Sequence, residues 1–359
     1  MRYEEHAPGD RAFLTLPIVG RGAYDLPMTD TAVDLPDGGS PADLEPRIHE
    51  HRGELTGYCY RMLGSAFDAD DAVQETMVRA WRGLDGFEGR AKLRSWLYRI
   101  ATNVCLDMLD GRNRRARPMD LSPGAWQPVE ASLSAVQPEV TWVEPMLDAH
   151  VIAASADPAE KAVARESIRL AFIGALQHLP PRQRAVLILR DVLRWKADEV
   201  AVFLESSVAS VNSALQRARA TLAASGINDL QPFDPLDERN TELLSRYVDA
   251  FERYDMETLV TLLHEDATQN MPPYEMWLQG RDDVITWMLG PGSGCRGSRL
   301  VATMANGAPA LAQYRPSPVG GHEPWALHVL DVSDGRIAGI TSFLDTRLFE
   351  HMGLPTRMD

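Results

Sequence analysis

The sequence predicts a multidomain protein in which two all-α domains are followed by an α+β domain. In two long stretches, apolar residues recur at intervals of three and four, as amphipathic helices require. Five closely spaced prolines lie between these stretches and a sixth begins the second one, too close together for a helix to survive. After Asp237, two helical patterns lead into alternating runs bounded by Gly and Pro, which is typical of strands in an α+β domain.

The predicted boundaries follow these changes of pattern. In chain order we expect a disordered extension (1–44), a helical domain (45–117), an acidic Pro-rich linker (118–157), a second helical domain (158–225) and an α+β domain (237–359). Asp68 is the expected N-cap of a helix in the first domain. In the last domain we expect helices over 240–254 and 256–263, and strands over 298–305, 309–314, 325–332 and 336–344.

The composition limits the function classes. No apolar run approaches the ~18 residues that span a bilayer, and Glu4 and Glu5 stand where a secretory signal carries basic residues. We therefore expect a cytoplasmic protein with no membrane contact. Three scattered cysteines (Cys59, Cys105 and Cys295) give neither a disulfide framework nor a metal site, and no cofactor is implied.

The net charge of −15 is distributed unevenly along the chain. Residues 79–117 hold ten Lys and Arg against four acids, and residues 182–219 hold seven against four. The linker from 118 to 160 has seven acids and no Lys or Arg. Two basic islands in an acidic chain are suited to contact with a phosphate backbone, although a basic run is often only a solvated face.

The pattern over Ala197–Leu222 is the strongest single signal. An amphipathic helix (197–204), a turn at Glu205–Ser207 and a second helix (208–219) form the layout of a helix-turn-helix. Ala201 would let the helices approach closely, and Val208, Val211 and Leu215 would face the hydrophobic core. The other face carries polar groups that read bases or hold phosphates: Ser207, Ser210, Asn212, Ser213, Gln216, Arg217 and Arg219. An ordinary αα-hairpin is the alternative.

A second signal is a basic helix expected over Ala91–Arg117, in which aromatic residues alternate with cations. Unpaired bases stack on aromatic rings while cations follow the backbone, so the pattern suits single-stranded DNA. Burial of Trp96 in the hydrophobic core is the competing interpretation. The candidate DNA contacts are Lys92, Arg94, Trp96, Arg99, Asn103, Arg112, Arg114 and Arg115.

Residues 54–117 and 158–223 resemble regions two and four of sigma-70 family factors of the extracytoplasmic-function group. The resemblance rests on Asp68–Trp81, Phe87–Asn103, Leu179–Leu187 and the helix-turn-helix. It implies a transcription initiation factor whose partners are the β and β′ subunits of core RNA polymerase and double- and single-stranded promoter DNA. The basic helix would read the −10 element and the helix-turn-helix the −35 element. The implied polymerase contacts are Asp70, Asp71, Gln74, Glu75, Arg79 and Trp81. One departure is Glu205, where the family usually has glycine in the turn.

Residues 238–355 resemble the SnoaL-like superfamily, whose α+β cone is also used by isomerases. Sigma factors that carry this domain are a known subgroup and often lack a separate anti-sigma partner, so we expect the domain to modulate the factor in cis. Two alternatives stay open: a small-molecule sensor, or an active or vestigial isomerase-like enzyme. The expected pocket lining is Tyr254, His264, Asp266, Met271, Trp277, Trp287, His328 and Phe343. The protein as a whole is expected to be no enzyme.

Overall fold

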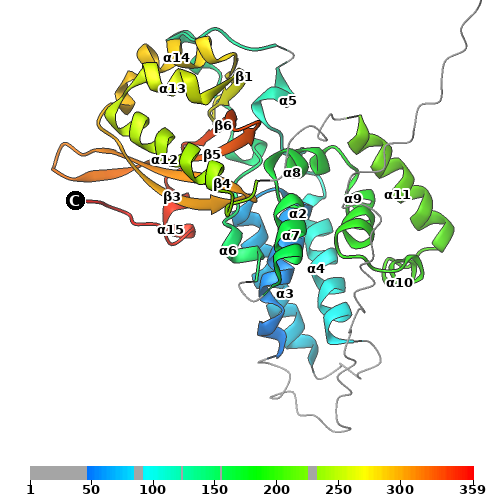
Figure 1. The fold of residues 1–359 in the computed structure, drawn as a ribbon. Coiled ribbons are helices and arrows are strands. Elements are labelled where there is room, and N and C mark those ends of the chain that lie inside the picture. Colours follow the sequence, from blue (N-terminus) through cyan, green and yellow to red (C-terminus); the bar gives the residue numbers. More distant parts are fainter. Residues whose placement is uncertain (1–46, 85–91, 123, 154–155, 225–232) are drawn as a thin grey trace, which may run out of the picture. The chain divides into compact units, whose positions relative to one another are not determined.

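The computed structural model describes residues 47–84, 92–122, 124–153, 156–224 and 233–359. The predicted disordered extension (1–44) lies outside these residues, as does the part of the predicted −10 segment before residue 92. Figure 1 shows the helices and strands in chain order.

The first helical region consists of α2 (Arg52–Leu63), α3 (Ala66–Gly83) and α4 (Leu93–Leu109). Gly64 ends α2 with a left-handed backbone (φ 73°), and Ser65 begins α3 by accepting a hydrogen bond from the Asp68 amide at 3.0 Å. The prediction of Asp68 as the N-cap is therefore wrong. Ser65 holds that position, which leaves the Asp68 carboxylate free to pair with arginines from another segment.

The linker contains little helix. Its described residues form only brief helical turns: α5 (Pro118–Leu121), η2 (Glu130–Ser134), η3 (Glu139–Thr141) and α6 (Asp148–Val151). The prolines limit helix length here, as expected, but they do not prevent single turns. Part of the linker packs into the protein, because Trp142, Val143 and Met146 are buried.

The second helical region begins after a capping box in which Asp157 and Glu160 bond each other's backbone amides. It ends in the predicted helix-turn-helix. Its elements are α7 (Pro158–Glu166), α8 (Leu170–Gln177), α9 (Pro181–Leu187), the π-helical turn η4 (Ile188–Val192), α10 (Ala197–Phe203) and α11 (Val208–Ala223).

The C-terminal domain combines helices with a six-stranded sheet of order β2-β1-β6-β5-β4-β3, in which β1 and β6 are parallel and the other neighbours antiparallel. Its helices are α12 (Glu238–Arg253), α13 (Met256–Leu262), α14 (Arg281–Leu289), η6 (Pro291–Cys295) and α15 (Arg347–His351). Its strands are β1 (Leu263–Asn270), β2 (Trp277–Gln279), β3 (Arg299–Ala305), β4 (Ala308–Pro316), β5 (His322–Ser333) and β6 (Arg336–Phe343). The sequence pattern missed β1, β2, α14 and α15.

Both faces of this sheet are apolar, because neighbouring residues of a strand point to opposite sides. In β4, Leu311 belongs to a hydrophobic core shared with α12–α14, while Ala312 and Tyr314 belong to the core of the helical regions. In β5, Leu330 packs in the core shared with α12–α14, and Leu327 packs in the core of the helical regions. The sheet thus continues the hydrophobic core of α2–α11, so the C-terminal domain is not an independently packed appendage.

Candidate nucleic-acid interface

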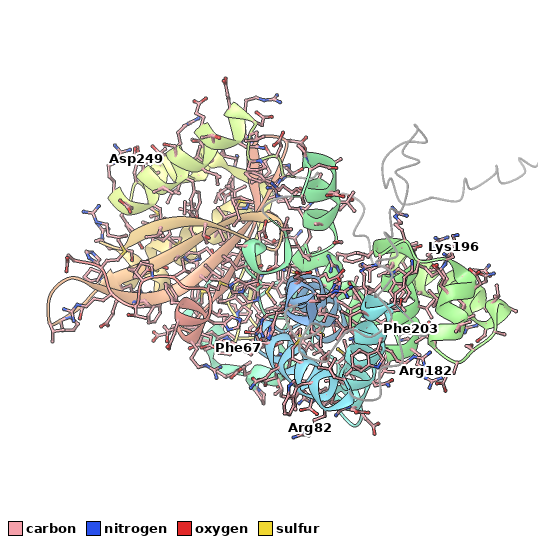
Figure 2. All side chains as sticks on the ribbon, turned by 90° about the horizontal axis from the view of Figure 1, so that it is seen from below. Phe67, Arg82, Arg182, Lys196, Phe203 and Asp249 are labelled. Carbon is pink, nitrogen blue, oxygen red and sulfur yellow. The ribbon has the colours of Figure 1, made fainter. Side chains whose placement is uncertain are left out.

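The helix-turn-helix is built by a short turn between α10 and α11. Phe203 is buried at the end of α10, and Lys196 precedes its first turn (Figure 2). Ser207 caps α11, because its hydroxyl accepts a hydrogen bond from the Ser210 amide at 3.1 Å. Glu205 sits in the turn with φ 50°, the left-handed conformation for which glycine is better suited. The departure from the family's glycine therefore falls at a position where it costs free energy.

One face of α11 is polar and exposed, and the other is buried. Val211, Leu215, Ala218 and Leu222 pack inward. Val208, which was predicted to face the hydrophobic core, is 43% exposed because it opens the helix before the packed turns begin. The exposed face carries Ser207, Ser210, Asn212, Ser213, Gln216, Arg217 and Arg219. Arg219 differs from the others in donating two hydrogen bonds to Asp191, at 2.8 and 2.6 Å.

Several predicted DNA contacts on α4 make bonds within the protein. Arg94 donates to the Glu54 carboxylate at 2.8 Å and lies over the Tyr98 ring, 5.1 Å from its centroid. Burial raises the pKa of Glu54, but hydrogen bonds from His51 and the charge of Arg94 outweigh it, so the pKa is lowered overall. Tyr98 is buried against Trp195 of the second helical region, with ring centroids 5.5 Å apart.

A second bridge from α4 reaches the helix-turn-helix itself. The Arg99 guanidinium donates to the Val202 carbonyl at 3.2 Å and lies 4.0 Å from the Glu205 carboxylate. Lys92 and Asn103 are exposed, and Trp96 is partly buried against Gly83 of α3. The described conformation therefore leaves only part of the predicted −10 surface open to solvent.

The basic helix is shorter than predicted. It ends at Leu109, and Gly111 takes a left-handed backbone (φ 68°), so Arg112, Arg114 and Arg115 lie in a loop. Arg112 pairs with Asp68 at 3.1 Å, and Arg114 contacts the His178 ring nitrogen at 2.9 Å.

Arg115, one of the predicted DNA contacts, is buried in the structure. It is only 7% exposed and donates to the Asp68 carboxylate at 2.7 Å and to the Trp142 carbonyl at 2.6 Å. Its second charge partner is Glu144 of the linker, at 3.6 Å. These contacts give Arg115 a structural role, tying the linker to α3, in place of the predicted one.

The predicted polymerase contacts form one side of α3. Asp71, Gln74, Arg79 and Trp81 are exposed, and Trp81 stands out at 63%, a large apolar surface for an isolated helix face. Arg79 pairs with Glu75 at 2.7 Å and with Asp107 of α4 at 3.2 Å. Asp70 is different, because it meets His351 of α15, 3.7 Å from the imidazole nitrogen.

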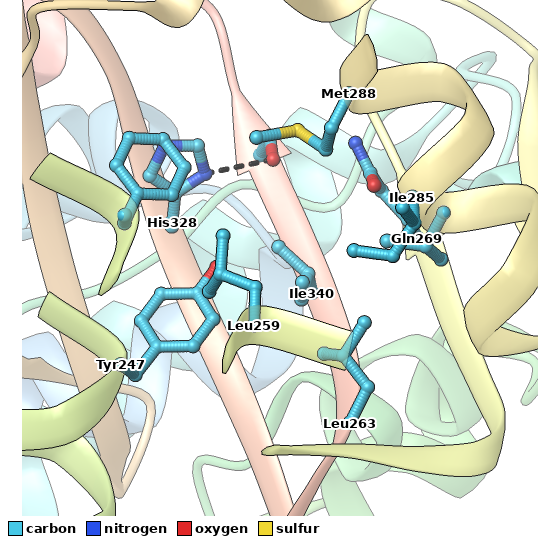
Figure 3. Close-up of a pocket in the computed structure, with 11 residues that line it drawn as sticks. Tyr247, Leu259, Leu263, Gln269, Ile285, Met288, His328 and Ile340 are labelled. Atoms are coloured by element: carbon cyan, nitrogen blue, oxygen red, sulfur yellow. Dashed lines mark hydrogen bonds between the residues drawn. The ribbon is translucent and has the colours of Figure 1, made fainter. Parts of the chain in front are cut away.

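The cone holds a small cavity of about 30 Å³, lined mainly by apolar side chains (Figure 3). Of the eight residues predicted to line it, only His328 does so. His328 bonds Ser342 and Gln313, each at 2.8 Å, and burial lowers its pKa to about 4, so the ring is neutral at pH 7. The cavity also contains Gln269, whose Oε1 is buried and unpaired among the described residues.

The other seven predicted lining residues lie elsewhere. Tyr254 caps α12 and donates to the Met288 carbonyl, Trp287 packs on Gly292, and Phe343 belongs to the core on the opposite face of the sheet. His264 and Asp266 lie on the solvent side of β1, Met271 follows its last residue, and Trp277 begins β2, opposite Asn270 of β1. The errors arose because β1 and α14 were not recognised. Without these two elements, the sequence could not predict that Gln269 and Met288 line the cavity.

Sequence reasoning also missed a contact made by a hairpin tip. Asn306, between β3 and β4, is fully buried and accepts from the Met146 amide at 2.9 Å. Its amide donates to the Tyr60 hydroxyl and to the Ile168 carbonyl, both at 2.6 Å. The Asn306-Gly307 dipeptide between two strands is a strong hairpin signal and could have revealed the turn, but not what it contacts.

Among the described residues, no cluster of His, Cys, Asp and Glu has an arrangement that would hold a metal ion. Within the same ranges, none of the helices has the length and apolar character needed to cross a membrane. Cys59 and Cys105 are buried free thiols, and Cys295 is a partly exposed one.

Comparison with known proteins agrees with this architecture. Residues 47–115 match Sigma-70 region 2, residues 169–222 match Sigma-70 region 4, and residues 244–340 match the SnoaL-like domain. The fold and the exposed helix-turn-helix thus define a sigma factor with an added SnoaL-like domain, as predicted.

The relatives narrow this class further. The ECF RNA polymerase sigma factor SigG of Mycobacterium tuberculosis is 45% identical over 323 residues, which cover 87% of this chain and 84% of SigG. SigJ from the same organism is 28% identical over 301 residues, covering 80% and 88%. The crystal structure of SigJ shares the fold, with a TM-score of 0.53 and 23% identity over 88% of this chain and all of that one. The chain belongs to the extracytoplasmic-function sigma factor family, and it directs promoter-specific initiation by core RNA polymerase.

Proposed function

We propose that α11 reads the −35 element, that α4 reads the −10 element, that α3 docks on core polymerase, and that the C-terminal domain controls these activities in cis. The exposed polar face of α11, with Gln216 and Arg217 at its centre, supports the first assignment. The exposed Trp81 beside Gln74 and Asp71 supports the docking assignment. Promoter binding and opening need no covalent step, so we assign the chain no catalytic role.

Cis control rests on one observation, the burial of the β3–β4 hairpin tip. Besides the three bonds of Asn306, the Gly307 amide donates to Asp148 of the linker at 2.8 Å. A side chain at position 307 would collide with the backbone of Arg165 in α7. One turn of the C-terminal domain therefore contacts the linker and both helical regions. Whatever moves this domain also changes how the two promoter-reading regions are held.

The ligand-sensing alternative has weaker support. The unpaired Gln269 Oε1 provides one acceptor, but the cavity has room for only one or two water molecules in this conformation. A metabolite would require the cone to open. We therefore place control at the hairpin tip and keep the cavity as the secondary candidate.

The chain offers a matched pair of variants to test cis control. Gly307 and Gly335 both follow a left-handed residue at the tip of a two-residue hairpin, with φ 66° and 69°. Alanine costs similar backbone strain at both sites, but only position 307 is packed, since position 335 faces open space. In transcription from a target promoter with purified polymerase, Gly307→Ala should change output several-fold while Gly335→Ala matches wild type. Equal output from both variants would show that the docked tip does not control the factor.

A further inference from the structure

The last helix of the chain covers the start of the helix assigned to polymerase docking. Arg347 of α15 places its guanidinium over the Phe67 ring of α3, 5.2 Å from the ring centroid. His351, one turn later, packs on the same ring with centroids 4.7 Å apart, and its Nδ1 lies 3.7 Å from the Asp70 carboxylate. Phe67, labelled in Figure 2, is thus covered by two side chains of α15.

Three further contacts keep α15 in this position. Phe349, between Arg347 and His351, is fully buried and meets the Tyr314 ring of β4 edge-on at 5.1 Å, which anchors the helix to its own sheet. On the linker side, Glu139 pairs with Arg347, and the His150 ring meets that of His351 at 5.9 Å. Anchor and contact residues are separate, so the contact can be removed without removing the anchor.

The covered surface overlaps the proposed docking surface. Asp70 is one of the six predicted polymerase contacts. Its side chain stays 43% exposed beside His351, and its neighbours Asp71 and Gln74 on α3 are exposed as well. A partner approaching the exposed part of α3 would meet α15 at its first turn. Since two bodies cannot occupy that turn at once, binding of one must weaken binding of the other.

We infer that α15 is a cis-acting cap on α3, which competes with core RNA polymerase for Phe67 and Asp70. The inference rests on the proposed docking role of α3. The cap is held by a few side-chain contacts, and His351 Nε2 is buried with no partner among the described residues. Release of the cap returns that nitrogen to water, which favours opening. Docking then starts at Asp71 and Gln74 and is completed when α15 leaves.

The direct test measures the affinity of full-length variants for core polymerase. Arg347→Ala with His351→Ala removes the cap contacts and leaves Phe349 in place. Arg239→Ala with His264→Ala is the matched control, since both residues belong to the same domain and have no described contact with α3. The apparent Kd is the intrinsic Kd divided by the uncapped fraction, so the cap variant should bind about five- to tenfold more tightly. Backbone amides in the first turn of α3 should also exchange hydrogen faster in the cap variant.

A milder variant guards against misfolding of the double mutant. Glu139 belongs to neither α3 nor α15, and its side chain is 48% exposed. Glu139→Gln removes only the ion pair with Arg347. It should raise polymerase affinity about two- to threefold. If both variants are folded and bind core polymerase no more tightly than wild type, the proposal that α15 caps α3 is wrong.

Charge reversal at Asp71 separates the cap from the docking assignment. If Asp71→Arg weakens binding to core polymerase while the cap variants behave like wild type, α3 docks but α15 does not compete. If Asp71→Arg binds as well as wild type, α3 is not the docking helix, and both proposals fall.

Discussion

Helices α4 and α11 were both predicted to meet DNA, and the structure treats them differently. On α11 the polar side chains face solvent, and within the described part of the chain only Arg219 has a strong internal partner. On and after α4, the cations bind protein groups: Arg94 binds Glu54, Arg99 binds the helix-turn-helix, and Arg115 is buried. Polarity and spacing identify a DNA-facing helix when nothing else competes for its cations. They fail where a nearby carboxylate or carbonyl is brought in by a distant segment.

The largest expected effect separates two arginines that look alike in the sequence. Arg115→Ala removes a charge partner from the buried Glu144 and from Asp68, whose side chain is 18% exposed, and should cost about 3 kcal/mol of unfolding free energy. Arg217→Ala, on an exposed face, should change stability by less than about 0.5 kcal/mol. It should instead weaken promoter binding and lower the salt slope by about one. Denaturant unfolding and binding across salt concentrations measure both. A stable Arg115→Ala with a large DNA defect would restore the original prediction.

The next effect is a pH dependence of stability that arises at Glu144, the linker partner of Arg115. Burial, opposed by Arg115 and by a hydrogen bond from Ser65, raises the pKa of Glu144 to about 7. The folded state thus holds this proton more tightly than the unfolded chain. The contribution of Glu144 to stability is complete below the unfolded pKa of about 4.5 and is lost as the pH rises through 7. Wild type should therefore lose stability between pH 5 and pH 8. Glu144→Gln should reduce this loss of unfolding free energy by about 1–2 kcal/mol. Parallel pH profiles for variant and wild type would show that Glu144 is ionised throughout.

The smallest effect concerns the turn before α11. Glu205→Gly relieves the left-handed strain at φ 50° and should stabilise the protein by about 1 kcal/mol. Glu205→Ala keeps the strain and removes the carboxylate near Arg99, so it serves as the control. A melting temperature that rises equally in both variants would assign the effect to charge and not to the backbone.

Local patterns were enough to predict the helices of the sigma regions and most of the sheet. The turn at Glu205–Ser207 and the exposed face of α11 were located because they depend on neighbours within one or two turns. Strand β1 was missed because its residues Leu263–Asn270 are mostly polar, and only Ala267, Gln269 and Asn270 among its later residues are buried. The burial of Arg115 and Asn306 depends on partners 27 to 246 residues away, which periodicity does not report.

The placement of α15 also affects the order in which surfaces appear during synthesis. Helix α3 begins at Ala66 and α15 at Arg347, so about 280 residues separate the proposed docking surface from its proposed cap. At about 5–20 residues per second, the ribosome takes on the order of 15–60 s to make that interval. During this time the nascent chain carries a docking helix with nothing to cover it. In the proposed scheme, a nascent chain that meets polymerase during this interval is uncapped, whereas the completed factor is capped.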